Sequence, residues 1–236
     1  MIGDPHIDDD GCDIEALEND LTVIRNTRAM YAGHLGDLTN NWIGRLARLY
    51  ANQVTTAAQS IKLMEWMLDR VPNLFVVNGN HDCWGNGSDL ISFILRSQGT
   101  VNNSHGMRLA LNFESGKQVR IHARHDFKGH SQYNPVHGHR KEQLWSGNRD
   151  HIYVSGHRHT DACSVVPHPD GTCSWSFIVS GYKVVDDYAD ENGFRDGKMS
   201  PAVAVVINPN ASPAELIKPF WDLQAAADYL TWLRKK

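Results

Sequence analysis

Side chains that commonly bind metal ions follow apolar runs at successive points along this sequence. They are Asp4, His6, Asp37, Asn80, His125, His157 and His159. Carboxylate and amide oxygens, together with imidazole nitrogens, suit borderline divalent metals such as Mn, Fe, Zn, Co or Ni. These seven ligands are too many for one tetrahedral zinc ion and about right for two ions with open positions. The pattern therefore predicts a site for two metals.

Two of these motifs place their ligands at alternate positions. Asp4 and His6 stand in "DPH", and His157 and His159 stand in "HRH". Side chains at alternate positions of an extended backbone point to the same side. We therefore expect each pair to reach one small volume from an extended segment.

The stretch "LFVVNGNHDCW" calls for more than a structural explanation. Asn78 and Gly79 suit a turn after the apolar run 74–77. A turn does not account for Asn80, His81 and Asp82, which come directly after that run. Open α/β sheets place ligands and catalytic groups at this point, just beyond the end of a strand.

The elements that must position these residues alternate between helices and strands in the first half of the chain. They are a helix over 13–26 capped by Asp13, a strand ending at Gly36-Asp37, a helical region over 42–68, a strand over 74–77 and a helix from Ser88 to Gly99.

The second half of the chain is richer in strands. It contains predicted hairpins over 107–126 and 162–182, strands over 151–155 and 201–209, and a helix within 213–236. Residues 125–150 have little regular pattern, and long loops inside compact domains tend to be functional. The sequence shows no repeat and no linker, so we expect one α/β domain over residues 1–236.

Composition limits the classes of protein to consider. The chain has 236 residues, 41% hydrophobic and 21% charged, as in a soluble globular protein. The net charge of −4 does not indicate binding to nucleic acid, although a local basic groove stays open. There is no apolar run of about 18 residues and no signal peptide, so we expect no membrane span and a cytoplasmic location. The four cysteines form no C-x-x-C pair, and free thiols are expected.

The order of the motifs carries a resemblance to a known family. D-x-H, G-D, G-N-H-D, a histidine and G-H-x-H follow one another between Asp4 and His159. This series resembles that of the calcineurin-like metallophosphoesterases. Each motif alone is weak, because Gly-Asp and Gly-His are common, but the five in order are specific.

The resemblance implies a fold and a ligand set. The implied fold is a four-layer α/β/β/α sandwich with a dinuclear metal site at the strand ends. Asp4, His6 and His159 would hold one metal; Asn80, His125 and His157 would hold the second; Asp37 would bridge both. Manganese comes first among the expected metals, followed by Fe, Zn, Co or Ni.

The resemblance also implies a reaction on a phosphate-ester substrate. Two metals about 3.5–4 Å apart can ionise a bridging water, and the hydroxide attacks phosphorus. His81 would act as acid or electrostatic catalyst, with Asp82 orienting it. A neutral Asn80 in place of a second aspartate would keep the charge of the site low enough to admit an anionic phosphate.

Three features depart from the family pattern. Residues 1–3 precede Asp4 where a longer apolar strand is usual, so that strand is either very short or the chain begins later than in its relatives. Asn40 replaces the second aspartate of G-D-x-x-D. The fourth motif usually reads His-Gly, and here His122, His125 and His130 are all candidates; we choose His125 because it falls just past the predicted strand.

The long loop supplies candidate substrate-binding residues. Arg124, Lys128 and His130 form a basic stretch that would face phosphate, with a solvated loop as the alternative. We rank a phosphodiester or a small phosphomonoester above long DNA as substrate. A DNA exonuclease or endonuclease is the second hypothesis, and a metal-bound scaffold without turnover is the third. Steeply salt-dependent DNA affinity would favour the nuclease. The sequence gives no indication of the oligomeric state.

Overall fold

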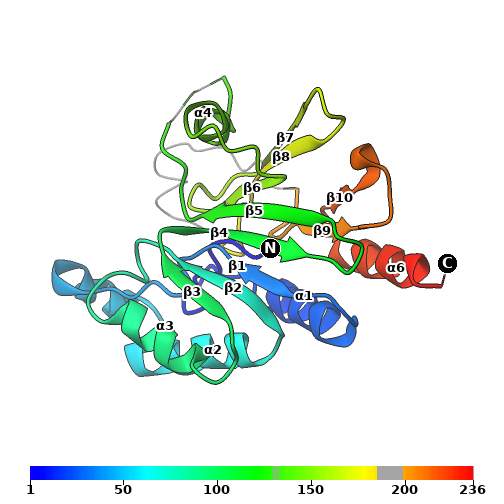
Figure 1. The fold of residues 1–236 in the computed structure, drawn as a ribbon. Coiled ribbons are helices and arrows are strands. Elements are labelled where there is room, and N and C mark those ends of the chain that lie inside the picture. Colours follow the sequence, from blue (N-terminus) through cyan, green and yellow to red (C-terminus); the bar gives the residue numbers. More distant parts are fainter. Residues whose placement is uncertain (130, 132, 185–198, 236) are drawn as a thin grey trace.

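In a computed structural model, which describes residues 1–129, 131, 133–184 and 199–235, two facing sheets lie between layers of helices (Figure 1). The first sheet is parallel and has the order β1 (Ala32–His34), β2 (Asn73–Asn78), β3 (Val101–Ser104). The second is mixed and has the order β4 (Gly106–Asn112), β5 (Gln118–Arg124), β6 (Ile152–Ser155), β8 (Cys173–Ile178), β7 (Ala162–Pro167). An antiparallel pair is formed by β9 (Ala204–Ile207) and β10 (Ile217–Phe220).

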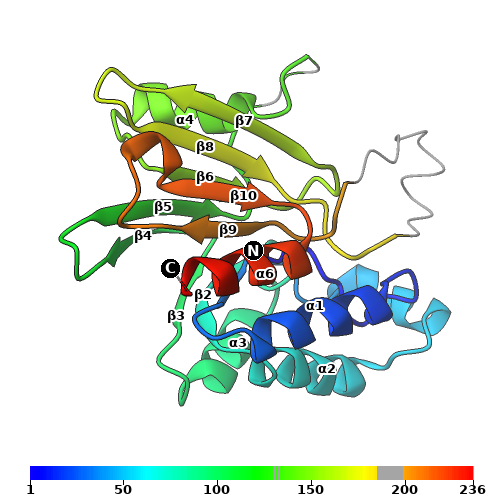
Figure 2. The same ribbon diagram turned by 90° about the vertical axis from the view of Figure 1, so that its right-hand side faces the viewer.

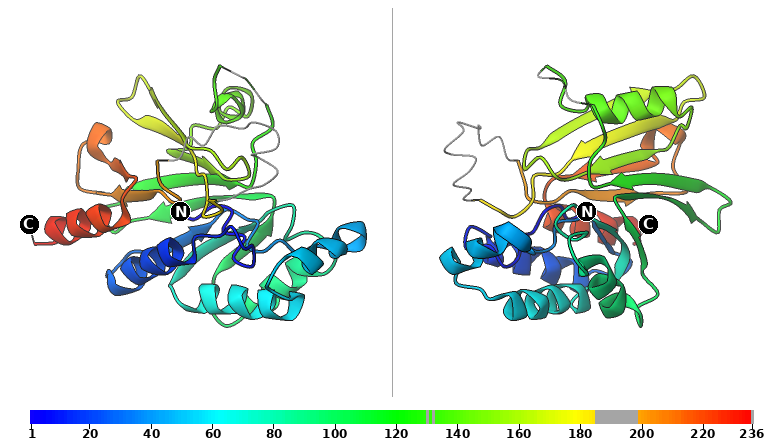
Figure 3. Two further views of the ribbon diagram at one scale, coloured as in Figure 1. Left: turned by 180° about the vertical axis from the view of Figure 1, so that it is seen from behind. Right: turned by 90° about the vertical axis from the view of Figure 1, so that its left-hand side faces the viewer.

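Helices cover the outer faces of the two sheets (Figures 2 and 3). The first sheet carries α1 (Ile14–Asn26), α2 (Ala57–Asp69) and α3 (Gly87–Leu95), and α6 (Leu223–Leu233) packs beside α1. The second sheet carries α4 (His137–Trp145). Two 3-10 helices, η1 (Gly44–Asn52) and η2 (Pro213–Glu215), complete the described elements. The predicted mixed α/β fold with four layers is confirmed.

Strand β2 shows how the sequence builds two cores. Val76 packs with the helices of the outer layer, whereas Phe75 and Val77 point to the other face and pack between the sheets. This follows from the period-two alternation of side chains along a strand. A strand buried on both faces reads as an unbroken apolar run, which explains "LFVV".

The chain ahead of Asp4 forms an isolated bridge in place of a regular strand. Ile2 pairs in parallel with His34 of β1 and antiparallel with Ala202 on its other side. Ile2 is fully buried, so these few residues anchor the segment that follows. Asp4 is thereby placed beside the carboxyl end of β1.

The predicted helical region 42–68 is wrong as one element. It forms η1 and then α2, with a break at 53–56. The break has a local cause, because Thr56 and Gln59 form a capping box that starts α2 at Ala57. The exposed η1 contains no buried residue, so packing does not hold it in line with α2.

Other boundaries also differ from the prediction. Helix α3 is preceded by Asn86 and ends at Leu95, so the predicted limits Ser88 and Gly99 are wrong. The stretch 125–150 is not loop throughout, because it contains α4. Strands β3 and β10 were not predicted. The hairpins β4–β5 and β7–β8 are confirmed, as are the free thiols of all four cysteines.

No helix in the described ranges is long and apolar enough to cross a bilayer.

Candidate metal centre

Asp37 lies at the centre of the predicted ligands, three residues after β1. It is buried, and its Oδ1 accepts a hydrogen bond from the backbone N–H of His81 at 2.9 Å. Its Oδ2 lies 3.3 Å from Nε2 of His125, 3.9 Å from Nε2 of His6 and 4.0 Å from Nε2 of His81. One carboxylate oxygen thus faces three imidazoles that come from different segments of the chain.

Asp4, His6 and His159 form a first group of ligand-type residues. Their candidate ligand atoms all lie within 4.8 Å of one another. Oδ2 of Asp4 accepts the backbone N–H of His157 at 2.5 Å. Oδ1 of Asp4 and Nδ1 of His6 are buried and have no hydrogen-bond partner among the described residues. Buried polar atoms normally have partners, so these two atoms leave positions that a metal ion could fill.

A second group consists of Asp37, His125 and His157, whose ligand atoms also lie within 4.8 Å of one another. His125 follows β5 directly, and its Nδ1 donates to the carbonyl of Leu35 at 2.8 Å. Its Nε2 lies 2.9 Å from Oδ1 of Asn80 and 3.0 Å from Nδ1 of His157. The Leu35 carbonyl fixes the ring and leaves Nε2 for the group, as partners of metal-bound histidines commonly do.

His122, the alternative to His125, lies elsewhere. Its ring packs against Phe127 and Tyr153, and its Nδ1 lies 3.9 Å from the carboxylate of Asp150. The structure thus brings His125 into the ligand group and keeps His122 on the opposite face of β5, beneath α4.

The backbone at the ligands is left-handed, which corrects the expectation of extended "DPH" and "HRH" segments. The φ angles are 37° at Asp4, 39° at His6, 52° at Asp37, 73° at His157 and 50° at His159. Non-glycine residues seldom adopt such angles, which cost about 1–2 kcal/mol each. Strain of this kind clusters at functional sites, where the surrounding structure holds it in place.

Two motif glycines are explained by the carboxylates beside them. A Cβ atom at Gly79 would lie 2.2 Å from Oδ1 of Asp37, and one at Gly156 would lie 2.3 Å from Oδ2 of Asp4. Neither clash can be relieved without moving Asp37 or Asp4. The glycine before Asn80 and the glycine before His157 are therefore required by the close approach of the backbone.

Burial and nearby carboxylates shift the pKa values of several groups in the site. Burial raises the pKa of Asp4 well above its usual range, and burial lowers the pKa of His6 to about 3. Burial alone would lower the pKa of His125, but the carboxylates of Asp37 and Asp4 raise it to about 10. Without a metal ion, a protonated His125 therefore places a positive charge beside these carboxylates, at the position where the donor atoms suit a divalent metal. The oxygen and nitrogen donors, their spacing and the unpartnered atoms all fit such ions.

Metal binding is expected to release protons. At pH 7 a metal must displace the proton on His125, whose pKa is raised to about 10, so about one proton should leave when a metal binds at the group that contains His125. The apparent metal affinity should rise as the pH approaches 10 and fall as the pH is lowered. Calorimetric titration with Mn(II) in two buffers of different ionisation enthalpy measures this release, and equal heats in both buffers would contradict it.

His81 is oriented by Asn40, and the predicted role of Asp82 in orienting it is wrong. Nδ1 of His81 donates to the main-chain carbonyl of Asn40 at 2.6 Å. Because a carbonyl only accepts, this bond places a proton on Nδ1 and leaves Nε2 to face Asp37. The side chain of Asn40 donates to Asp9 at 2.9 Å and does not take part in this bond. Asparagine at position 40, where the family pattern has aspartate, therefore still supports His81 through its main chain.

Asp82 holds the backbone of the two strand ends together. Its Oδ1 accepts the N–H of Leu38 at 3.0 Å, and its Oδ2 accepts the N–H of Gly79 at 2.8 Å. Burial and the charge of Asp37 raise the pKa of Asp82 to about 7. Asp82 therefore supports the turns that carry Asp37 and Asn80.

The predicted substrate-binding residues are only partly placed beside the site. Lys128 is exposed, and its Nζ lies 3.4 Å from Oδ2 of Asp126. Arg124 donates to the main-chain oxygen of Asp126 at 3.4 Å and does not contact the ligand groups in any described bond. His130 lies outside the described residues.

Arg158 was missed by the sequence reasoning. It stands between His157 and His159, and its Nη2 lies 3.2 Å from Oδ1 of Asp126. Its position between the two histidines of "HRH" is visible in the sequence, but the orientation of the Arg158 side chain depends on Asp126. An arginine at this place brings positive charge to the edge of the second ligand group.

Trp42 and Trp84 were also missed. Their ring centroids lie 5.2 Å and 4.2 Å from that of His81. Each stands within three residues of a motif residue, Asn40 or His81, and this proximity is the signal that could have found them.

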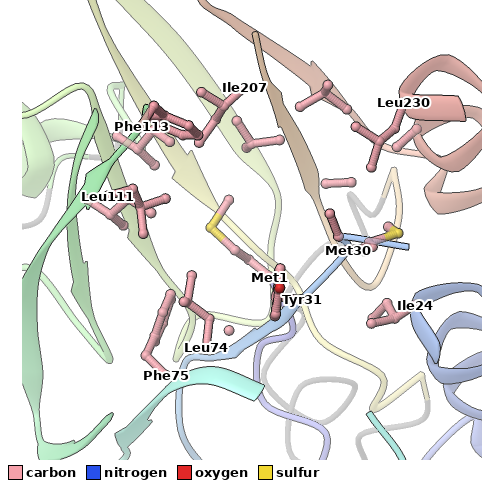
Figure 4. A pocket seen from close by; sticks show the side chains of 18 of the residues that line it. Met1, Ile24, Met30, Tyr31, Leu74, Phe75, Leu111, Phe113, Ile207 and Leu230 are labelled. Atoms are coloured by element: carbon pink, nitrogen blue, oxygen red, sulfur yellow. The ribbon is translucent and has the colours of Figure 1, made fainter. Parts of the chain in front are cut away.

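A separate cavity lies at the other end of the strands (Figure 4). It has a volume of about 590 Å³ and is lined mostly by apolar side chains, among them Met30, Leu74, Phe113 and Leu230. Met30 precedes β1 and Leu74 is near the start of β2, whereas the ligand groups follow the ends of these strands. This cavity offers little to an anionic phosphate.

The two facing sheets and the histidines and carboxylates at their strand ends define an α/β protein with a candidate metal site. A model of the calcineurin-like phosphoesterase family matches residues 1–186. The chain belongs to this family, and it is a hydrolase that acts on phosphate esters.

Comparisons with individual proteins add little to this assignment. The chain is similar to the solved structure of an archaeal phosphodiesterase, with 12% identity, a TM-score of 0.39, and coverage of 75% of this chain and 79% of that chain. A likeness this weak supports no conclusion about the activity. No curated protein sequence gives a significant match.

Proposed function

We propose that the chain hydrolyses a phosphodiester or a small phosphomonoester with two divalent metal ions. Asp4, His6 and His159 would hold one ion, and Asn80, His125 and His157 would hold the other. Asp37 would be shared between them. The observation that carries the proposal is the position of Asp37 Oδ2, which faces His6 of the first group and His125 of the second at 3.9 and 3.3 Å.

The bound ions would lower the pKa of a water and offset charge on the phosphoryl oxygens. The chain itself would supply the proton for the leaving group. Because Nδ1 of His81 is bonded to the carbonyl of Asn40, Nε2 is the atom that exchanges protons, and it faces Asp37. As the water oxygen bonds to phosphorus and the ester P–O bond breaks, Nε2 would give its proton to the leaving oxygen.

Charge at the edge of the site would favour an anionic substrate. Asn80 is neutral, so the second ligand group carries one carboxylate, that of Asp37. Arg158, held by Asp126, lies beside this group, and Lys128 shares the same carboxylate. We propose that Arg158 and Lys128, with Arg124 and His130 further along the same stretch, attract and hold the phosphate.

The activity is tested by reconstituting the protein with Mn(II) and assaying bis(p-nitrophenyl) phosphate and p-nitrophenyl phosphate. Two metals per chain, with turnover that a chelator abolishes and Mn(II) restores, are expected. Two bound metals without turnover of either ester would contradict the general phosphoesterase and favour a scaffold or a narrow substrate range.

A further inference from the structure

Two tryptophans form a wall beside His81 that the proposed reaction does not use. The His81 ring centroid lies 4.2 Å from that of Trp84 and 5.2 Å from that of Trp42. The two indole centroids are 6.3 Å apart, and their planes are inclined by 34°. Aromatic rings about 4.5–7 Å apart are already in contact. The indoles therefore present one continuous surface and not a slot between them.

Hydrogen bonds hold this wall in place without any ligand. Nδ2 of Asn41 donates to the carbonyls of His81 and Trp84 at 2.7 and 3.0 Å, which ties residues 40–42 to the turn at 81–84. Nε1 of Trp42 donates to Oε1 of Gln53 at 3.2 Å, which fixes the plane of that indole. A surface ordered beforehand loses little conformational entropy when a ligand binds.

The wall is accessible from solvent and lies on the leaving-group side of the proposed reaction. Trp42 and Trp84 are both half-buried, so part of each ring is exposed. An acid must come within about 3 Å of the oxygen that it protonates. The group attached to the leaving oxygen is therefore brought next to His81 and to the indoles that contact it.

We propose that Trp42 and Trp84 stack on the base of a nucleoside leaving group, so that the site selects nucleotide esters. This inference rests on the proposed function, because the position of the leaving group follows from the role of His81. Aromatic side chains stack on any base, and such stacking strengthens binding by about 10-fold or more. If these side chains served only to pack against His81, any apolar side chain of similar volume would suffice, and no aromatic ring would be required.

The test is a calorimetric titration of the Mn(II)-loaded protein with two phosphonates that cannot be hydrolysed. One is the adenosine 5′-phosphate analogue with methylene in place of the bridging oxygen, and the other is the matching ribose analogue without a base. We expect the adenosine compound to bind about 10-fold or more tightly. Trp42→Leu and Trp84→Leu keep apolar volume and should remove this preference, whereas Trp84→Phe should keep most of it.

Two controls separate stacking from unfolding. The ribose analogue should bind all variants equally, which shows that the phosphate site is intact. Trp145→Ala, on α4 at a side chain 78% exposed, should leave both affinities unchanged. Equal affinities of the two analogues for the wild type, or leucine variants that retain the base preference, would overturn the proposal.

The outcome also distinguishes this inference from the proposed function. If the protein hydrolyses phosphate esters but shows no preference for a base, the stacking proposal is wrong and the proposed activity stands. If the protein prefers the analogue with a base but hydrolyses no ester, Trp42 and Trp84 form a nucleotide-binding surface and the proposed reaction is wrong.

Discussion

Replacing Asp37 with asparagine is expected to remove at least one metal ion from the protein. The Oδ2 atom of Asp37 faces His6, His81 and His125 within 4.0 Å, so this carboxylate lies between the two ligand groups. Loss of a mere hydrogen-bond partner of a ligand commonly weakens metal binding by about 10–100-fold. Loss of the shared ligand itself should exceed about 100-fold.

Elemental analysis after reconstitution with Mn(II), followed by competition with a chelator, measures this loss. Asp20→Asn is the matched control, because Asp20 is on α1 and its carboxylate accepts the hydroxyl of Tyr182 at 2.6 Å. That variant should retain the metal content of the wild type. An Asp37→Asn protein that still holds two ions with unchanged affinity would refute the shared ligand.

Replacing His81 with alanine is expected to lower kcat by about 10²–10⁴-fold on alkyl phosphate esters while both metals stay bound. The loss should be much smaller on p-nitrophenyl esters, because p-nitrophenolate leaves without receiving a proton. This dependence on the leaving group separates proton donation from a structural role. His168→Ala, on the β7–β8 turn, should leave kcat unchanged, since His168 bonds to Ser174 far along the second sheet.

The metal content of the same variant tests a competing role for His81. Together with His6 and Asp37, His81 also forms a group whose ligand atoms lie within 4.8 Å of one another. If His81 were a ligand, His81→Ala would lose metal and would lose activity equally on alkyl and p-nitrophenyl esters. That result would reassign His81 from acid to ligand.

Much of the candidate site could be predicted because ligand types and strand ends are both visible in a sequence. "LFVV" is an unbroken apolar run, so the position of Asn80 and His81 beyond a buried strand followed from the letters. The choice of His125 over His122 followed in the same way, because His125 stands just past β5 and His122 within it. Prediction of the fold class required the order of the motifs along the chain as well as the predicted helices and strands.

Contacts between distant segments could not be predicted. The main-chain carbonyl of Asn40 orients His81, and a carbonyl is common to all residues, so the sequence favoured the carboxylate of Asp82 instead. Trp42 and Trp84 are 42 positions apart, and Asn41 brings them together through two bonds to main-chain oxygens. The break in the predicted helical region 42–68 is different, because it comes from a local capping box, Thr56 with Gln59, whose spacing is visible in the sequence.

The left-handed backbone at Asp4, His6, Asp37, His157 and His159 has a consequence for how this protein can change. Glycine would relieve the torsional cost at each position and would also delete a proposed metal ligand. Mutations that stabilise the chain and mutations that inactivate it therefore coincide at these sites, and a lineage released from the need for catalysis would gain stability by losing its ligands first. The folded chain, for its part, bears the ordering cost of the candidate site in advance, so an ion that bound there would meet a cage that is already formed.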